Sequence, residues 1–403
     1  MFFHLLAWLA LLAGSAPVAS FTDGLGWPLA ALHLVTLGVL AMTAIGASLQ
    51  LLPVATRQPV RSHRAPALIW WLYAPGVGLV ALGMGLAQPR WLALGAAAVT
   101  VALVAFALLL ARNLWHARGM PGVVAHGWTA LLALVALLAT ALLLVATWNG
   151  APLVARGTLL PLHVAFAAYG FMGMLALGLS YILVPMFALA PAPDERRQRA
   201  SFVCAAAALA LVVPASFGLA PRLFLAGAVG AGALAVALHL QLMARALATG
   251  MRRELGRSFK LVRFAWGALV ASLGVALALA LEAPIDHLGV WFGLVLIGGW
   301  LLTFLLGILQ RILPFLASMH AGPGVRPPTP ASLTFDRPLA VHFVCHLAAL
   351  ALLALALALE NALLVRVAAA AGAIGAAAFA LFYVVLLLRM HRAARAVPAP
   401  PRT

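Results

Sequence analysis

Three of the twelve histidines have the chemistry and the positions to bind a metal inside a membrane. His33, His163 and His287 each lie in a long apolar segment, 20, 22 and 27 residues before the proline of a repeated motif. Ionisable side chains are costly within a bilayer, so each is a candidate functional residue. Imidazoles without nearby carboxylates suit haem iron or copper, whereas magnesium and calcium take oxygen ligands. The alternative is a single interhelical hydrogen bond for each histidine.

His342 and His346 form a second candidate metal site. Their i, i+4 spacing places both imidazoles on one face of a helix, as in a two-histidine metal site. Asp336 and Arg337 come just before them, so the alternative is a capping or interfacial role near the helix end. The other histidines are expected in loops, or at helix ends in contact with water: His4, His63, His116, His126, His239, His320 and His391.

The elements that position these residues carry the motif G-x7-G-x6-P three times. The copies are Gly38, Gly46 and Pro53; Gly170, Gly178 and Pro185; and Gly299, Gly307 and Pro314. The prolines lie 132 and 129 residues apart, which predicts three copies of one unit. We therefore expect pseudo-repeats 1–122, 123–256 and 257–403 within a single transmembrane domain.

The composition is that of a membrane protein. Hydrophobic residues make up 66% of the chain and charged residues 8%, and the mean hydropathy is +1.11. Twelve apolar segments are long enough for membrane helices: 2–20, 26–53, 66–87, 91–113, 126–148, 157–188, 200–219, 222–247, 261–282, 287–317, 338–358 and 365–389. This predicts an all-α polytopic membrane protein with four helices per unit, the motif falling on helices 2, 6 and 10.

The first segment has a second interpretation. SAPVAS at 15–20 resembles a signal-peptidase site, but no Lys or Arg precedes the apolar stretch. Because removal would leave the first unit one helix short, we expect the segment to be retained as a helix.

Basic residues predict the orientation. Of the 25 Lys and Arg residues, most follow the even-numbered helices, which places both termini in the cytoplasm of a bacterial inner membrane. Arginines scattered over six loops do not indicate a nucleic-acid partner. Cys204 and Cys345 lack CxxC spacing, so we interpret both as packing residues.

Depth can be counted from each motif proline. At 1.5 Å rise per residue, His33 and His163 differ in depth by about 3 Å, and His33 and His287 by roughly 10 Å. The motif glycines let helices approach closely and, in this interpretation, leave room for a flat ligand.

With these motifs the chain resembles subunit I of the haem-copper oxidase and nitric oxide reductase superfamily. The resemblance implies that His33 is an axial haem ligand and that His163 matches a copper ligand on helix 6. It also implies an H-x-H pair on helix 10, but Phe292 and Leu294 occupy those positions. The start of helix 7, SFVCAAAALA, lacks the expected histidine pair, so the usual dinuclear centre cannot form.

The resemblance therefore implies a divergent member that keeps one haem. A haem b held by His33 and either His287 or His163 would transfer electrons, or bind or reduce a diatomic gas. Copper is a further expected cofactor, and a redox protein or respiratory complex subunit an expected partner. All eight acidic residues lie in loops or at helix ends, so we do not expect a proton-pumping oxygen reductase. The alternatives are a cofactor-free twelve-helix transporter and an assembly or scaffold subunit of a respiratory complex.

Overall fold

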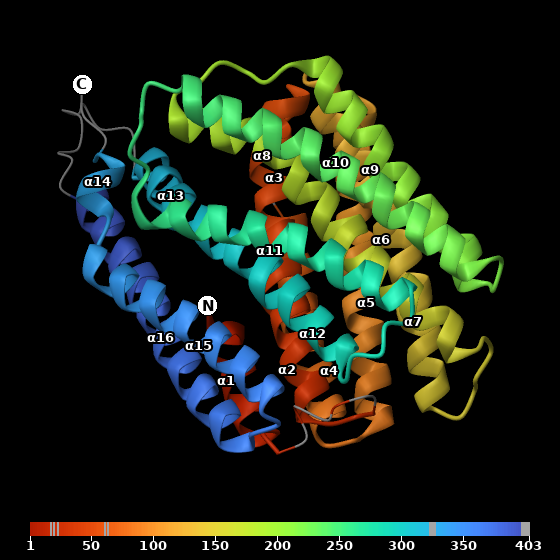
Figure 1. Ribbon diagram of the computed structural model, residues 1–403. Coiled ribbons are helices and arrows are strands. Elements are labelled where there is room, and N and C mark those ends of the chain that lie inside the picture. The colour runs from red at the N-terminus through yellow and green to blue at the C-terminus, as the bar shows by residue number, and fades with distance from the viewer. Residues whose placement is uncertain are drawn as a thin grey trace, which may run out of the picture.

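The structure is a computed structural model that describes residues 1–16, 18, 21, 24–59, 62, 64–321 and 328–395. All regular secondary structure in these residues is helical (Figure 1), as the sequence predicts. The helices are α1 (Phe2–Ala13), α2 (Trp27–His33), η1 (Leu34–Ala41), α3 (Met42–Thr56), α4 (Ala65–Gly85), α5 (Pro89–Trp115), α6 (Pro121–Trp148), α7 (Arg156–Val164), η2 (Ala165–Gly173), α8 (Met174–Ala188), α9 (Glu195–Ser216), α10 (Pro221–Thr249), α11 (Gly256–Ala280), α12 (Leu288–Gly293), η3 (Leu294–Leu302), α13 (Thr303–His320), α14 (Pro330–Leu333), α15 (Asp336–Ala358) and α16 (Ala362–Arg395).

Eleven helices within the described residues are long and apolar enough to cross a membrane. This is the architecture of a polytopic α-helical membrane protein. The first predicted span, 2–20, is the exception, because α1 ends at Ala13 and has only 12 residues. At 1.5 Å per residue it is about 18 Å long, short of a bilayer core of about 30 Å. Gly14 follows it and Pro17 comes three residues later, and both residue types favour a helix end.

Several helices start earlier than their apolar patterns predict, and α9 shows why. The sequence places the start of the seventh helix at residue 200, but α9 begins at Glu195. The side chain of Asp194 accepts a hydrogen bond from the backbone N–H of Arg197 and so caps the new first turn. Charged residues at a capped helix end therefore extend the helix beyond its apolar part.

The three motif prolines lie in three long helices of the same construction. Each is an α-helix interrupted by a π-helical segment: α2–η1–α3, α7–η2–α8 and α12–η3–α13. The π-helical segments end at Ala41, Gly173 and Leu302, which is twelve residues before Pro53, Pro185 and Pro314 respectively. Such segments are uncommon and frequently mark functional sites.

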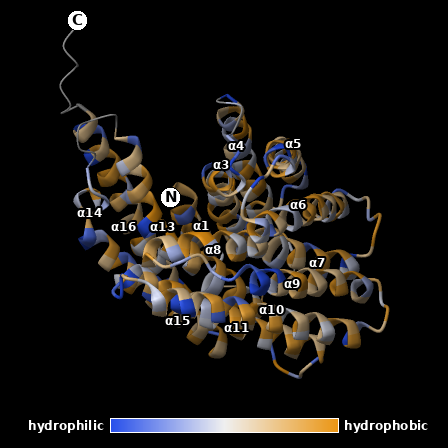
Figure 2. Ribbon diagram, turned by 90° about the horizontal axis from the view of Figure 1, so that it is seen from above, coloured by the Kyte–Doolittle hydropathy of each residue, from blue (hydrophilic) through white to orange (hydrophobic). Residues whose placement is uncertain are grey.

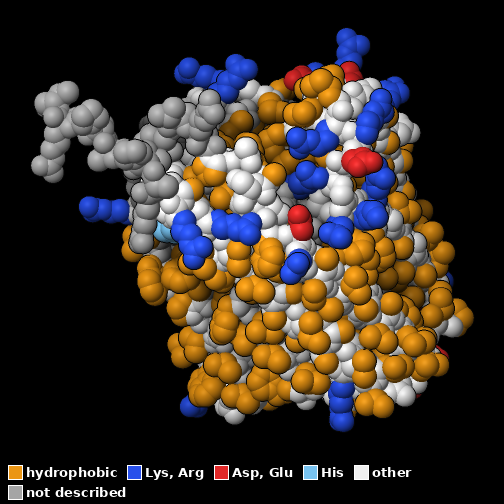
Figure 3. All heavy atoms as spheres, turned by 90° about the vertical axis from the view of Figure 1, so that its left-hand side faces the viewer, with side chains coloured by type: hydrophobic (Ala, Val, Ile, Leu, Met, Phe, Trp, Pro, Cys, Tyr) orange, Lys and Arg blue, Asp and Glu red, His pale blue; other side chains and the backbone are white. Residues whose placement is uncertain are grey.

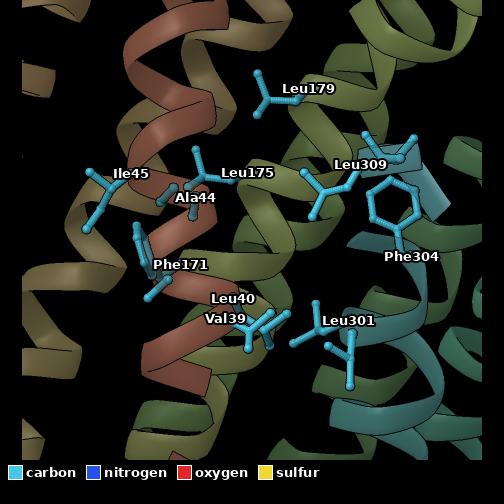
Figure 4. Close-up of a cluster of buried hydrophobic side chains, with 14 of the residues drawn as sticks. Val39, Leu40, Ala44, Ile45, Phe171, Leu175, Leu179, Leu301, Phe304 and Leu309 are labelled. Carbon is cyan, nitrogen blue, oxygen red and sulfur yellow. The ribbon is translucent and has the colours of Figure 1, made fainter. Parts of the chain in front are cut away.

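These three helices run in the same direction through the centre of the bundle. Figure 1 shows α2, α7 and α12 toward its lower end and α3, α8 and α13 toward its upper end. They meet through apolar side chains, among them Leu40, Phe171, Leu175, Leu301 and Phe304 (Figure 4). A dense apolar core therefore holds the motif helices at fixed positions relative to one another.

Charge is concentrated at one end of the bundle. The helices are hydrophobic over most of their length, with hydrophilic residues at the ends and in the loops (Figure 2). On the face in Figure 3, Lys and Arg side chains gather toward the upper end, above a broad band of hydrophobic side chains. The upper end is where α3, α8 and α13 finish, so the basic residues follow the motif prolines in space as well as in sequence.

Candidate functional site

The structure brings His33 and His163 together. His33 is the last residue of α2, and His163 is the penultimate residue of α7. Their ring centroids are 6.4 Å apart, and the ring planes are tilted by 31°. Both side chains are partly buried, and a π-helical segment begins within two residues after each of them. Helix α2 packs against α1 and α4, whereas α7 packs against α6 and α9, so different neighbours support the two imidazoles.

Hydrogen bonding fixes which His33 nitrogen is available. His33 Nδ1 lies 3.0 Å from the carbonyl oxygen of Leu29. Because a carbonyl can only accept, Nδ1 donates, and Nε2 of the neutral ring carries the free lone pair. Metal-ligating histidines commonly anchor their other ring nitrogen in this way. On the partner ring, Nδ1 of His163 is buried and has no hydrogen-bond partner.

The separation of the two rings suits two imidazoles on opposite sides of one metal. A metal–imidazole nitrogen bond of about 2.0–2.1 Å places two such ring centres roughly 6 Å apart. The observed 6.4 Å is close to that value. His33 and His163 therefore fit the axial ligands of a haem iron, or two ligands of a single ion.

His287 lies apart from this pair. It is the residue before α12, in the left-handed region with φ 56°. Its Nε2 is 3.1 Å from Glu360 Oε1, at an exposed position between α12 and the α15–α16 turn. Among the described residues no ring contact or hydrogen bond joins His287 to His33 or His163.

His342 and His346 belong to a second cluster, which also contains His4. The rings of His342 and His346 are stacked, with centroids 5.5 Å apart, and the His4 ring lies 6.4 Å from His342. All three side chains are at most 1% exposed. The cluster joins α1 to α15, so the water contact expected for His4 is wrong. The sequence gives no signal for this contact, because α1 and α15 are more than 300 residues apart.

Contacts with other helices orient both residues of the i, i+4 pair. His342 Nδ1 donates to the carbonyl of Gly375 at 3.1 Å. Thr303 donates its only hydroxyl proton to the carbonyl of Gly298, so its oxygen accepts from His346 Nε2 at 2.7 Å. His342 Nε2 and His346 Nδ1 therefore carry lone pairs, and both are buried without a partner. Unsatisfied polar atoms are costly in an apolar interior, typically about 1–3 kcal/mol each.

His4 has the opposite hydrogen-bonding state. Trp8 Nε1, which can only donate, points to His4 Nε2 at 3.2 Å. The proton of a neutral His4 ring therefore lies on Nδ1, which is buried and has no acceptor. His4 thus adds a buried N–H donor beside the lone pairs of His342 and His346.

Two further histidines are buried rather than at the water interface. His126 and His239 are 0% and 1% exposed, and both rings contact the ring of Tyr181, at centroid distances of 5.5 and 5.2 Å. His126 bonds only to the carbonyl of Gly122 in its own helix. His33 makes the same i−4 bond, and so do the exposed His116, His320 and His391. That contact is therefore local helix geometry, unlike the interhelical bonds of His342 and His346.

The position where the resemblance expects a histidine on helix 10 lies against an apolar cavity. The cavity has a volume of about 490 Å³, and Phe292 is part of its lining, together with residues of α7, α9, α10 and α11. The lining contains no His, Cys, Asp or Glu side chain. Its Tyr169 hydroxyl lies 2.9 Å from the hydroxyl of Ser272. This cavity therefore offers packing surface rather than metal ligands.

Five of the six motif glycines pack against neighbouring helices, and these five do not open the space for a flat ligand that the sequence suggests. A Cβ on Gly170 would lie 2.6 Å from Cβ of Ala133, and one on Gly178 would lie 2.8 Å from Cβ of His126. Glycine at these positions lets the motif helix touch α6. Gly46 is different, since a Cβ there would meet nothing within 4 Å.

The remaining candidate ligands do not extend either histidine site. Cys204 and Cys345 are both free thiols. Among the described residues no group of three or more His, Cys, Asp or Glu side chains is arranged to hold a metal ion. Each candidate centre therefore rests on two imidazoles. No protein-family model and no curated protein matches the chain.

Proposed function

We propose that this protein is a haem-binding membrane protein in which His33 and His163 are the axial ligands of a haem b. The observation that carries the proposal is the 6.4 Å separation of two imidazoles on two of the three motif helices. The Nδ1 bond of His33 is the i−4 contact that other helical histidines of the chain also make, so it adds only that Nε2 of the neutral ring carries the lone pair. We assign His163, rather than His287, as the second haem ligand, because His287 pairs with Glu360.

A bound haem would supply one-electron redox chemistry at this position. With both His33 and His163 holding the haem, no position would be left for a diatomic gas, which would favour electron transfer. The chain contributes fixed ring orientation from Leu29 and apolar surroundings, since Ala30, Ala31 and Leu34 next to His33 are buried. Neutral ligands and apolar walls are among the factors that tune the potential of such a centre.

The proposal includes the threefold architecture and the likeness to oxidase subunit I. The equal distance of twelve residues between each π-helical segment and its proline supports three related units. Glycine contacts relate the second and third of these units, but not the first, since a Cβ on Gly46 would meet nothing within 4 Å. Gly170 and Gly299 face Ala133 and Ala268, while Gly178 and Gly307 face His126 and Leu261, each seven residues earlier in the partner helix.

We further propose that the protein lies in a bacterial inner membrane with its C-terminus in the cytoplasm. The sequence also predicts a cytoplasmic N-terminus, but α1 has only 12 residues and is too short to cross the bilayer core, so eleven spans do not place both termini on one side. The concentration of Lys and Arg side chains at one end of the bundle supports a cytoplasmic C-terminus. His33 and His163 then lie in the outer half of the bilayer. An electron-transfer partner, either a redox protein or a subunit of a respiratory complex, would reach the centre from that side.

Visible spectroscopy tests the haem directly. The protein is purified in mild detergent, and oxidised and reduced spectra are recorded together with a pyridine-haemochrome assay. We expect a Soret band and a six-coordinate low-spin spectrum. A preparation without a Soret band after expression with added haem precursor refutes the proposal and favours a cofactor-free transporter or a scaffold subunit.

A second function, binding of monovalent copper, is favoured by the buried pair His342 and His346. Each of the two stacked rings carries a buried lone pair without a partner, on His342 Nε2 and His346 Nδ1, and the ring centroids are 5.5 Å apart. Structural zinc sites take four ligands, whereas Cu(I) accepts two. Burying a single charge also costs less than burying a divalent ion.

Metal analysis tests this copper site. Wild-type protein loaded with Cu(I) and washed with a chelator is expected to keep about one copper per chain. His342→Ala and His346→Ala should lose it, and His346→Met should retain much of it because a thioether also binds Cu(I). His126→Ala is the matched control, an equally buried histidine outside the cluster. Copper retained by both alanine variants contradicts the assignment.

A further inference from the structure

A basic cavity opens where α11, α13 and α15 meet at the charged end of the bundle. Its volume is about 780 Å³, within the usual range of ligand pockets. Four cationic side chains line it, namely Arg252, Arg257, Lys260 and Arg311. Among the described residues of the lining, Asp336 is the one carboxylate. This excess of positive charge indicates an anionic ligand.

The cations of this cavity are not neutralised within the described part of the chain. None of the four forms an ion pair with a carboxylate there. Arg311 is half-buried and donates to two neutral groups, the carbonyl of Leu255 and the hydroxyl of Ser258. These bonds hold the guanidinium in place and leave its charge uncompensated. A buried cation normally has a partner of opposite charge.

Two further donors converge on the same cavity. Gln310 is 6% exposed, lines the cavity, and its amide nitrogen has no hydrogen-bond partner. The N-terminus of α11, at Gly256, also lines it and has no side-chain cap. The first-turn N–H groups and the dipole of a helix favour an anion at that end. A fixed arginine, an unpartnered buried amide and a helix N-terminus together make a built anion site.

We propose that this cavity binds a phosphate group. Phosphate suits the donors, because its oxygens accept several hydrogen bonds at once and arginine matches their geometry. The group is either the headgroup of an anionic phospholipid or a soluble phosphate. Both present the same phosphate oxygens to the donors of the cavity. The cavity lies at the ends of the helices, where a lipid headgroup and a soluble anion can both reach it. The site is separate from the two histidine centres.

Two probes distinguish the sources in the full-length purified protein. Native mass spectrometry measures binding of dioleoylphosphatidylglycerol against dioleoylphosphatidylcholine. Thermal unfolding in potassium phosphate, against potassium chloride at equal ionic strength, measures binding of the soluble anion. Binding of phosphatidylglycerol, but not of inorganic phosphate, assigns a lipid headgroup. Stabilisation by inorganic phosphate, without phosphatidylglycerol binding, assigns a soluble phosphate. Binding of neither overturns the proposal.

Charge-matched variants test the location. Arg257→Ala with Lys260→Ala removes two exposed cations from the lining, and we expect at least tenfold weaker binding of the probe that bound. Arg245→Ala with Arg263→Ala removes two exposed cations outside the lining and should change binding less than twofold. Gln310→Met keeps the side-chain volume and should weaken binding severalfold. Equal loss in both double variants overturns the proposal, because it shows a general charge effect.

Discussion

The imidazoles of His33 and His163 lie with their ring centroids 6.4 Å apart, each at the start of a π-helical segment. The two residues are 130 positions apart in the sequence, and their helices are supported by different neighbours. A metal held between them would link two of the three motif helices near the end of the bundle opposite the basic residues. Metal loading and the packing of these helices are therefore expected to be coupled.

Substitution of either histidine is expected to change the haem spectrum. His33→Ala and His163→Ala each remove one axial ligand, so haem per chain should fall at least tenfold, or the spectrum should become five-coordinate. The measurement is the Soret absorbance per mole of protein after identical purification. An unchanged low-spin spectrum in His33→Ala contradicts the ligand assignment.

His287→Ala is the internal control for these two variants. His287 pairs with Glu360 and lies outside the pair, so its removal should leave the Soret band and the haem content within error of wild type. Loss of haem in His287→Ala and in His33→Ala, but not in His163→Ala, would show that His287 is the second ligand in place of His163.

Thr303 is expected to orient His346 for copper. Its hydroxyl accepts from His346 Nε2 and so keeps the lone pair on Nδ1. Thr303→Val keeps the shape and removes the acceptor, which should weaken Cu(I) binding roughly 10–100-fold, the usual effect of losing such a support. The check is competition with a Cu(I) chelator. Thr140→Val is the control, since its hydroxyl bonds only within its own helix.

Equivalent motif glycines are expected to differ in their tolerance of alanine. A Cβ on Gly307 would lie 2.8 Å from the backbone oxygen of Ser258, which cannot rotate away, so Gly307→Ala should destabilise the protein by about 1–3 kcal/mol. Gly46→Ala meets open space and should be neutral or slightly stabilising, because alanine favours helix. Thermal unfolding in one detergent compares the two. Equal losses of stability in the two variants would show that the interhelical contact of Gly307 is not the reason glycine is needed there.

The exposed ion pair of Arg222 and Glu282 should have a small effect that depends on pH. The hydrogen bond and charge of Arg222 lower the pKa of Glu282. A lowered carboxyl pKa contributes stability above the unfolded-state value of about 4.3 and loses it as the pH falls through the folded-state value. Glu282→Gln should therefore lower the unfolding temperature by no more than about 2 °C at pH 7 and by nothing at strongly acidic pH. A larger difference at acidic pH than at pH 7 would reverse the sign and refute the argument.

The sequence by itself determined that the chain is a membrane protein and where its membrane-spanning helices lie. A long apolar segment in a bilayer forms a helix, because a single segment can make all of its backbone hydrogen bonds internally only as a helix. Eleven membrane-spanning helices could therefore be placed from composition. Counting from Pro53 and Pro185 also gave similar depths for His33 and His163, because the helical rise per residue is nearly constant. Which residues share a helix, and how deep each lies along it, can therefore be worked out from local helix geometry.

Only the tertiary structure decided which histidines meet. Rotation about a helix axis and the choice of neighbour depend on packing across helices, as where Gly170 lets its helix touch Ala133. Packing brought His4 against His342 across the whole length of the chain. It also left His287 outside the helix, in a left-handed conformation beside Glu360. These contacts join segments far apart in sequence, so no local pattern encodes them.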